Sequence, residues 1–355
     1  MKKFVLSFTI SLLVGLLLVG AYIVIADPFY YYHKPLFGAE AYMDNALYQT
    51  PGAAKNFQYD AVIVGSSMTE NFRESWFEEM GLNVQKLSYS GAEIKDYERI
   101  YDIVFGSGNN VGLVITDLNG FQFASPADAI YHEYPEYLYS RYAPTDVKYL
   151  YNNDVFWEAC GRKIEEIGFG RLKKDDSYTW EEETLFSEER ARYDYALFKD
   201  SLDESIAQGR YSKAMDEERM QIAQDNIALL EDIIQRYSET LFVFYLPAYS
   251  NLYWQEVIDE DDLDLMLDMY TMIVCELSGF DNVLMFDFQD DLELINDLNR
   301  YRDVCHHDPM GNRFVYECIR DTILRTGEHQ NEYLVDVMNI EEHINRVREN
   351  TNCTP

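Results

Sequence analysis

Residues that mark several familiar protein classes are scarce in this chain of 355 residues. Its 5 cysteines are an odd number scattered from Cys160 to Cys353, which argues against the disulfide framework of a small secreted domain. It contains no internal repeat and no low-complexity run. Its length and its 47% hydrophobic content fit one large globular domain or two small ones.

Positive charge is also scarce. The chain has 29 Lys and Arg against 63 Asp and Glu, a formal net charge of -34. Such a surface repels nucleic acid and anionic lipid headgroups, so we expect no nucleic-acid partner. Solubility is the simplest interpretation of this acidity. Attraction to a cationic or cation-coated cell-surface polymer is the alternative.

One apolar stretch, from Phe4 to Ile25, is long enough to span a bilayer. Lys2 and Lys3 precede it, which by the positive-inside rule leaves the amino end in the cytoplasm. The stretch ends without the small-x-small site of a cleavable signal peptide. The sequence therefore predicts a retained single-pass anchor over residues 1–26 in the cell membrane, with the rest of the chain extracytoplasmic.

Apolar runs alternate with helical patterns along residues 27–325, which indicates an α/β domain with a parallel sheet covered on both faces. Five strands are predicted, over residues 59–64, 84–88, 111–116, 240–246 and 282–286. Helices are expected over 69–80, 94–105, 217–237, 261–277 and 309–324. The acidic, Tyr-rich segment 149–209 interrupts the alternation and is interpreted as an insertion or cap. Residues 326–355 form a polar tail with a helix expected over 335–348.

Gly65-Ser66-Ser67 directly follows the first predicted strand and places a hydroxyl at the carboxyl edge of the sheet. Near the other end of the chain, Asp303 and His306 precede the last core helix and reach the same edge. Their spacing lets the carboxylate accept from one imidazole nitrogen while the other nitrogen faces Ser67. This pattern predicts a catalytic triad with Ser67 as nucleophile, His306 as base and Asp303 as the orienting acid.

An oxyanion also needs hydrogen-bond donors, which should come from loops after the neighbouring strands. Gly91 follows the second strand and could offer an unhindered backbone N–H. Asn119 follows the third strand and could offer its side-chain amide, and the backbone N–H of Ser67 is a further candidate. The aromatic segment 247–254 after the fourth strand supplies Tyr249 and Trp254 as candidates for the wall of a substrate pocket.

Each of these residues also has a purely structural interpretation. Ser67 fits the amino-terminal cap of the next helix, and Gly91 and Asn119 are ordinary turn residues. Tyr249 and Trp254 fit a hydrophobic core as well as a pocket wall. A metal site within residues 303–308 is a further alternative, but no second His or Cys cluster would complete its shell. Cys305 lies between the supposed acid and base, which disfavours it as a nucleophile.

At these motifs the chain resembles the SGNH (GDSL-like) hydrolase superfamily, over about residues 27–324. The similarity is strongest at Val64-Gly65-Ser66-Ser67, Pro247-Ala248-Tyr249-Ser250 and Tyr301-Arg302-Asp303-Val304-Cys305-His306. It favours the membrane-anchored branch related to cell-envelope polymer D-alanylation and O-acetylation proteins. The resemblance implies a three-layer sandwich with a five-stranded parallel sheet in flavodoxin-like order. It places the family's triad on Ser67, His306 and Asp303 and its oxyanion residues on Gly91 and Asn119.

The expectation from sequence is therefore an extracytoplasmic serine esterase or O-acyltransferase acting on acyl esters of cell-envelope glycans or polymers, with no cofactor. An anchored acyltransferase would need a multi-spanning membrane acyltransferase to deliver the acyl group. Hydrolysis and transfer differ only in the acceptor that reaches the acyl-enzyme, so sequence does not separate them. A catalytically silent glycan-binding or scaffold protein, and a metal-dependent hydrolase, are the alternatives from other classes.

Overall fold

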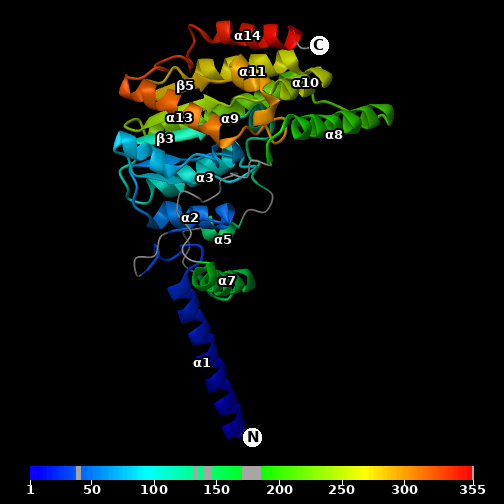
Figure 1. The fold of residues 1–355 in the computed structure, drawn as a ribbon. Helices are drawn as coiled ribbons and strands as arrows, with labels where there is room; N and C mark the ends of the chain where they lie inside the picture. Colours follow the sequence, from blue (N-terminus) through cyan, green and yellow to red (C-terminus); the bar gives the residue numbers. More distant parts are fainter. Residues whose placement is uncertain (37–40, 132–134, 140–145, 170–184, 354–355) are drawn as a thin grey trace.

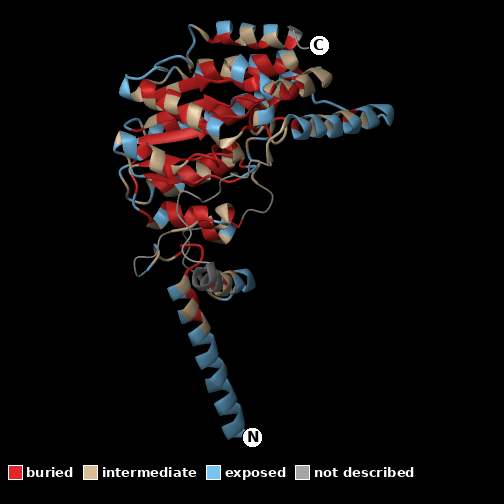
Figure 2. Cartoon of the chain, viewed as in Figure 1, coloured by how far each residue is buried: buried red, intermediate tan, exposed pale blue. Residues whose placement is uncertain are grey.

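The computed structural model describes residues 1–36, 41–131, 135–139, 146–169 and 185–353. Its first element, the helix α1 (Lys2–Ala26), projects away from the body of the protein (Figure 1). This helix is the one element of the described residues that is long and apolar enough to cross a membrane. Most of its side chains are exposed (Figure 2). An apolar helix of the expected position and length is therefore present.

The body of the protein is built around one mostly parallel sheet of six strands in the order β2-β1-β3-β4-β5-β6. The strands are β1 (Ala61–Ile63), β2 (Val84–Lys86), β3 (Leu113–Asp117), β4 (Leu241–Leu246), β5 (Val283–Asp287) and β6 (Leu334–Val335). The first five are parallel, and β6 pairs antiparallel with β5. The predicted count of five strands is therefore one too few. A two-residue strand in a polar tail has too short an apolar pattern to be read from sequence.

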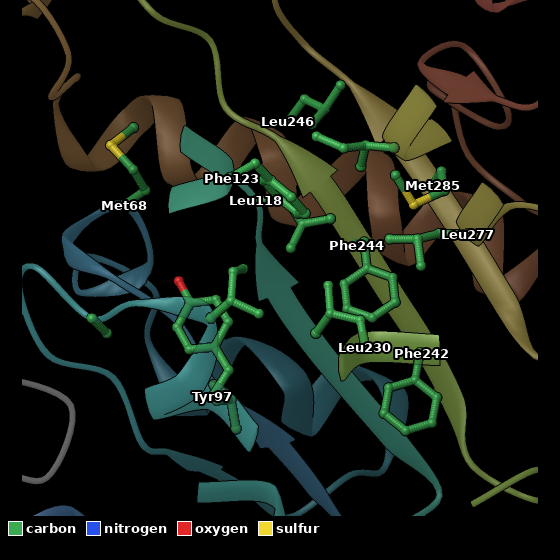
Figure 3. Close-up of a cluster of buried hydrophobic side chains, with 14 of the residues drawn as sticks. Met68, Tyr97, Leu118, Phe123, Leu230, Phe242, Phe244, Leu246, Leu277 and Met285 are labelled. Atoms are coloured by element: carbon green, nitrogen blue, oxygen red, sulfur yellow. The ribbon is translucent and has the colours of Figure 1, made fainter. Parts of the chain in front are cut away.

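The strands are buried on both faces, which explains why they appear in the sequence as continuous apolar runs. Because side chains alternate along a strand, Phe242, Phe244 and Leu246 of β4 enter one core, while Val243 and Tyr245 enter another. Figure 3 shows Phe242, Phe244 and Leu246 together with side chains of the first core. The sheet is thus held between two separate hydrophobic clusters.

Helices cover both faces of the sheet (Figure 1). The first core is closed by α3 (Ile94–Phe105), α9 (Asp216–Arg236) and α11 (Leu263–Leu277). The second is closed by the 3-10 helix η2 (Glu74–Met80), α12 (Leu292–Asn296) and α13 (Pro309–Leu324). Shorter helices connect the layers: α2 (Ala46–Asn56), η1 (Ser67–Thr69), α4 (Gly120–Ala124), α5 (Glu136–Tyr139), α10 (Asn251–Asp259) and η6 (Leu298–Arg300). The helices expected over 94–105 and 309–324 are confirmed with their bounds.

The single helix expected over residues 69–80 is wrong, because two short 3-10 helices, η1 and η2, occupy this segment. The Lys86 ammonium reaches into the gap between them and donates to the backbone carbonyls of Glu70 (2.5 Å) and Phe72 (2.9 Å). Those carbonyls therefore accept hydrogen bonds from a buried ammonium group and not from the backbone N–H groups of a continuous helix. Ser66, and not Ser67, is the residue that caps η1.

The helices of the predicted insertion, residues 149–209, pack in two separate parts of the structure. The short helix α6 (Asp146–Leu150) and α7 (Asn153–Phe169) contact the end of α1, whereas α8 (Glu188–Ala207) contacts α10 and η6. Figure 2 shows α8 extending outward with mostly exposed residues. The tail is equally well integrated, since β6 joins the sheet and α14 (Ile340–Cys353) contacts α11.

Candidate active site

The loop after β1 is shaped by a close approach to Asp117, the last residue of β3. A Cβ atom on Gly65 would lie 2.2 Å from an Asp117 carboxylate oxygen, so only glycine fits there. The buried Asp117 carboxylate accepts the backbone N–H of Ser66 (2.8 Å) and also the Ser66 hydroxyl. Ser66 is thereby locked in place, and the next residue, Ser67, is turned towards the sheet edge.

Ser67, His306 and Asp303 form one hydrogen-bonded chain. The Ser67 Oγ lies 2.7 Å from His306 Nε2, and His306 Nδ1 lies 2.6 Å from Asp303 Oδ2. With Nδ1 donating to the carboxylate, Nε2 is left to accept the serine proton. The structure therefore brings together the three residues that sequence spacing predicted as nucleophile, base and acid. Ser67 and His306 are 239 residues apart in the sequence.

The Asp303 carboxylate is fixed by hydrogen bonds from the backbone of its own loop. Its second oxygen, Oδ1, accepts the backbone N–H groups of Cys305 (2.9 Å) and His306 (2.7 Å). Burial acts to raise the pKa of Asp303, but the bonds from His306 and from these two N–H groups outweigh it, and the net pKa lies below its usual range. The carboxylate is therefore charged at neutral pH and suited to orient an imidazole.

Two further carboxyl groups surround Asp303 from helices α8 and α10. Asp194 accepts the backbone N–H of Val304 at 3.2 Å. The pKa of Glu256 is raised to about 8, first by burial and then by the charges of Asp194, Glu260 and Asp303. A carboxyl with a pKa of about 8 is mostly protonated at neutral pH, so Glu256 adds little negative charge beside Asp303. Arg302 lies 3.6 Å from Asp303 Oδ2, and Asp194 comes from the predicted insertion.

The loop after β2 faces the serine turn and is tied to it by two side-chain bonds. Thr69 donates to the Ser88 hydroxyl (2.6 Å), and the Ser90 hydroxyl donates to Glu70 Oε1 (2.9 Å). Gly91, at the end of this loop, is exposed and has a φ of +74°. The N–H groups of Gly91 and Ser67 donate no hydrogen bond within the described part of the chain. Both are therefore available as donors to a ligand.

Glu70 is a residue of the site that the sequence reasoning missed. It is 6% exposed, and burial raises the pKa of its carboxyl while Ser90, Lys86 and His306 act in the opposite direction. Its backbone N–H also bonds the Ser67 carbonyl. Glu70 therefore connects the turn that carries the serine to the loop that carries Gly91. The only sequence signal was its position three residues after Ser67, which does not reveal burial.

In the ranges that the structure describes, no hydrogen bond joins the Asn119 amide to the Ser67 hydroxyl. Asn119 is fully buried, and its Nδ2 atom donates to Asp117 Oδ2 (2.5 Å), Ser66 Oγ (3.2 Å) and Gln122 Oε1 (3.2 Å). Its Oδ1 atom accepts the Tyr249 hydroxyl. The amide is thus committed to holding Asp117 and Ser66, and its role as an oxyanion donor stays a prediction.

Tyr249 and Trp254 also differ from their predicted place in a pocket wall. Tyr249 is fully buried and Trp254 is 2% exposed, and both belong to the first hydrophobic core. The alternative interpretation as core residues describes them better. Aromatic residues after a strand give the same pattern in either setting, so the sequence could not separate the two.

A Cys305 nucleophile and a metal site within residues 303–308 are the alternatives to serine chemistry in this loop. Burial, followed by the charge of Asp303, raises the pKa of the Cys305 thiol far above its usual value, so the nucleophilic thiolate is disfavoured. Within the described residues, no group of three or more His, Cys, Asp or Glu side chains is placed to hold a metal ion. Cys160, Cys275, Cys305 and Cys318 are free thiols.

Comparison with known proteins adds no assignment. No protein-family model matches the chain, and a search of curated proteins finds no match either.

Proposed function

We propose that this protein is a serine esterase or O-acyltransferase that uses a Ser67–His306–Asp303 triad. The observation that supports the proposal most strongly is the continuous chain from the Ser67 hydroxyl through both nitrogens of His306 to Asp303. A serine that only capped a helix would not need an imidazole at 2.7 Å whose other nitrogen is fixed by a carboxylate.

In the proposed reaction, Ser67 Oγ attacks the carbonyl carbon of an acyl ester while its proton passes to His306 Nε2. The negative oxygen that forms accepts hydrogen bonds from the backbone N–H groups of Ser67 and Gly91. When the intermediate collapses, the ester C–O bond breaks and the departing alcohol takes the proton from His306. The acyl group is then an ester of Ser67.

The second half of the reaction runs in reverse with a new acceptor. Water or a glycan hydroxyl loses its proton to His306, attacks the acyl-serine and releases Ser67, which recovers a proton from His306. Asp303 stays ionised throughout and stabilises the imidazolium that forms twice per cycle. Water gives an esterase, and a sugar hydroxyl gives an O-acyltransferase.

Membership of the SGNH superfamily, in its membrane-anchored branch, is part of this proposal. It is supported by the Gly65-Ser66-Ser67 turn after β1, by the loop Asp303–His306 before α13, and by the parallel strand order β2-β1-β3-β4-β5. The two lysines before α1 favour an extracytoplasmic domain. The substrate class would then be acyl esters of cell-envelope glycans or polymers, with a multi-spanning membrane acyltransferase as donor partner where transfer occurs.

Labelling with a fluorophosphonate tests the proposal, because this reagent forms a stable adduct only with an activated serine. The full chain in detergent should be labelled, and Ser67→Ala and His306→Ala should abolish the signal or reduce it by about 10²–10⁴-fold. Ser201→Ala removes an exposed hydroxyl on α8, away from the triad, and is the control that should retain labelling. A folded wild-type protein that admits the probe but is not labelled would favour a glycan-binding or scaffold protein instead.

A further inference from the structure

A small structure lies against the end of the apolar helix α1. We call it the collar, residues 146–161; it comprises α6 and the first half of α7. In Figure 1, α7 lies beside the end of α1 and apart from the sheet. The Tyr22 hydroxyl of α1 donates to the Ala159 carbonyl at 2.8 Å, and the Tyr151 hydroxyl donates to the Leu16 carbonyl at 3.3 Å. These two contacts lie six residues apart along α1, or just under two helical turns.

The depth of these contacts follows from the length of the helix. Lys2 and Lys3 place the start of the hydrocarbon region near Phe4, and a core of about 30 Å takes about 20 helical residues. The apolar region then ends near Ile23. Leu16 lies seven residues earlier in the sequence, or about 10 Å inside the bilayer edge at 1.5 Å per residue. A side chain that reaches Leu16 must enter the membrane.

The collar exposes apolar side chains, as an element at the edge of the membrane should. Val155 and Ala159 are buried and pack with Ile23 of α1. Large apolar side chains of the collar are exposed: Val147 by 62%, Tyr151 by 47% and Trp157 by 63%. Trp and Tyr are the residues that concentrate at membrane–water interfaces, where an apolar ring and a polar tip are both satisfied.

Several hydrogen bonds also fix the connection between α1 and the body of the protein. The buried Asp27 carboxylate, directly after α1, accepts the backbone N–H groups of Tyr31, Tyr32 and His33 and the Tyr149 hydroxyl, each at 2.7–2.9 Å. Tyr139 then links this region to α2 through the Leu47 carbonyl at 3.0 Å. The anchor, collar and sheet domain are thus joined by ordered contacts instead of a free linker.

We infer that the collar is a membrane-interface element that inserts Trp157, Tyr151 and Val147 into the leaflet nearest the carboxyl end of α1. Its partner is the lipid surface itself. Insertion fixes the orientation of the sheet domain to the bilayer, which a single helix with a flexible linker would not do. The inference concerns how the protein is held at the membrane and does not depend on the proposed chemistry.

Tryptophan fluorescence of the full chain tests this. Wild type and Trp157→Phe are reconstituted into phosphatidylcholine vesicles with and without bromine on the upper acyl chain, and the difference between them reports Trp157. The inference predicts that brominated lipid quenches the Trp157 contribution and that aqueous iodide does not. Trp76→Phe is the control, because Trp76 packs with Tyr316 and Arg313 on the α13 side of the sheet and its contribution should be insensitive to bromine.

Two results would overturn the inference. If iodide quenches Trp157 and brominated lipid does not, the collar stands in water. If neither quenches it, Trp157 is covered by protein, as it would be by a second copy of this chain, and lipid is not its partner. Because Trp157 is exposed, its replacement by Phe should leave the melting temperature unchanged, and a circular dichroism melt checks that both proteins are folded.

Discussion

Two adjacent serines in this chain have opposite environments, and the difference determines which could react. Ser66 is fully buried and donates its hydroxyl proton to Asp117, whereas Ser67 is partly exposed and bonds His306. Burial raises the pKa of Asp117, and the bonds from Ser66 and Asn119 oppose that shift. Asp117 therefore acts as a structural acceptor that fixes the turn, while Asp303 serves the imidazole.

Replacing Asp303 by asparagine should lower the rate of fluorophosphonate labelling by about 10²–10⁴-fold without unfolding the protein. Asn keeps the shape of Asp but removes the charge that stabilises the imidazolium and fixes the Nδ1 proton. The matched control is Asp194→Asn, since Asp194 accepts the Val304 N–H of the same loop. Equal losses in both variants would mean that loop stability, and not the imidazole, determines the rate.

Glu70→Ala should slow labelling by about ten-fold or more, because it disconnects the Gly91 loop from the Ser67 turn. Glu70→Gln keeps an oxygen that accepts from Ser90 and should restore most of the rate. Equal labelling rates in wild type and both variants would exclude a positioning role for Glu70.

The triad could be predicted from sequence because each of its parts sits in a local pattern, a strand followed by Gly65 and a three-residue spacing before a helix. Asn119, Tyr249 and Trp254 could not be placed, because their environment depends on burial between elements far apart in the chain. Asn119 Oδ1 accepts from Tyr249, 130 residues away, and no local pattern encodes that bond.

At the scale of elements, the tail is part of the sheet domain and not an appendage. His343 of α14 lies 3.0 Å from Asp290, and Arg346 contacts the same carboxylate at 2.5 Å, beside the end of β5. The strands with long apolar runs were predictable, as were α3 and α13. The helix expected over 69–80 and the strand β6 were not, because a buried lysine and an antiparallel edge pairing override local propensity.

The buried Asp287 at the end of β5 gives this region a pH dependence. Burial, followed by the charge of Asp290, raises the pKa of Asp287 to about 7 in the folded protein, above its unfolded value. Its contribution to stability is therefore present at low pH and lost as pH rises towards and through 7. Asp287→Asn should have a higher melting temperature relative to wild type at pH 8 than at pH 5. A difference that does not change with pH would contradict this account.

At the scale of the whole molecule, a strongly acidic domain is attached to an apolar helix preceded by two lysines. If the orientation follows the positive-inside rule, protease added outside spheroplasts should digest the domain. The same protease should leave it intact in inverted vesicles. Protection in spheroplasts, with digestion in inverted vesicles, would place the domain in the cytoplasm and contradict the proposed substrates.

A covalent acyl-enzyme at Ser67 is the central intermediate of the proposed reaction. The direct measurement is to mix the full chain with p-nitrophenyl acetate, quench in acid within the first turnover, and determine the intact mass and the modified peptide. We predict one acetyl group per chain, located on Ser67 and absent from Ser67→Ala. An acetyl group on another residue, or no adduct in a folded protein that releases p-nitrophenol, would contradict the proposed triad chemistry.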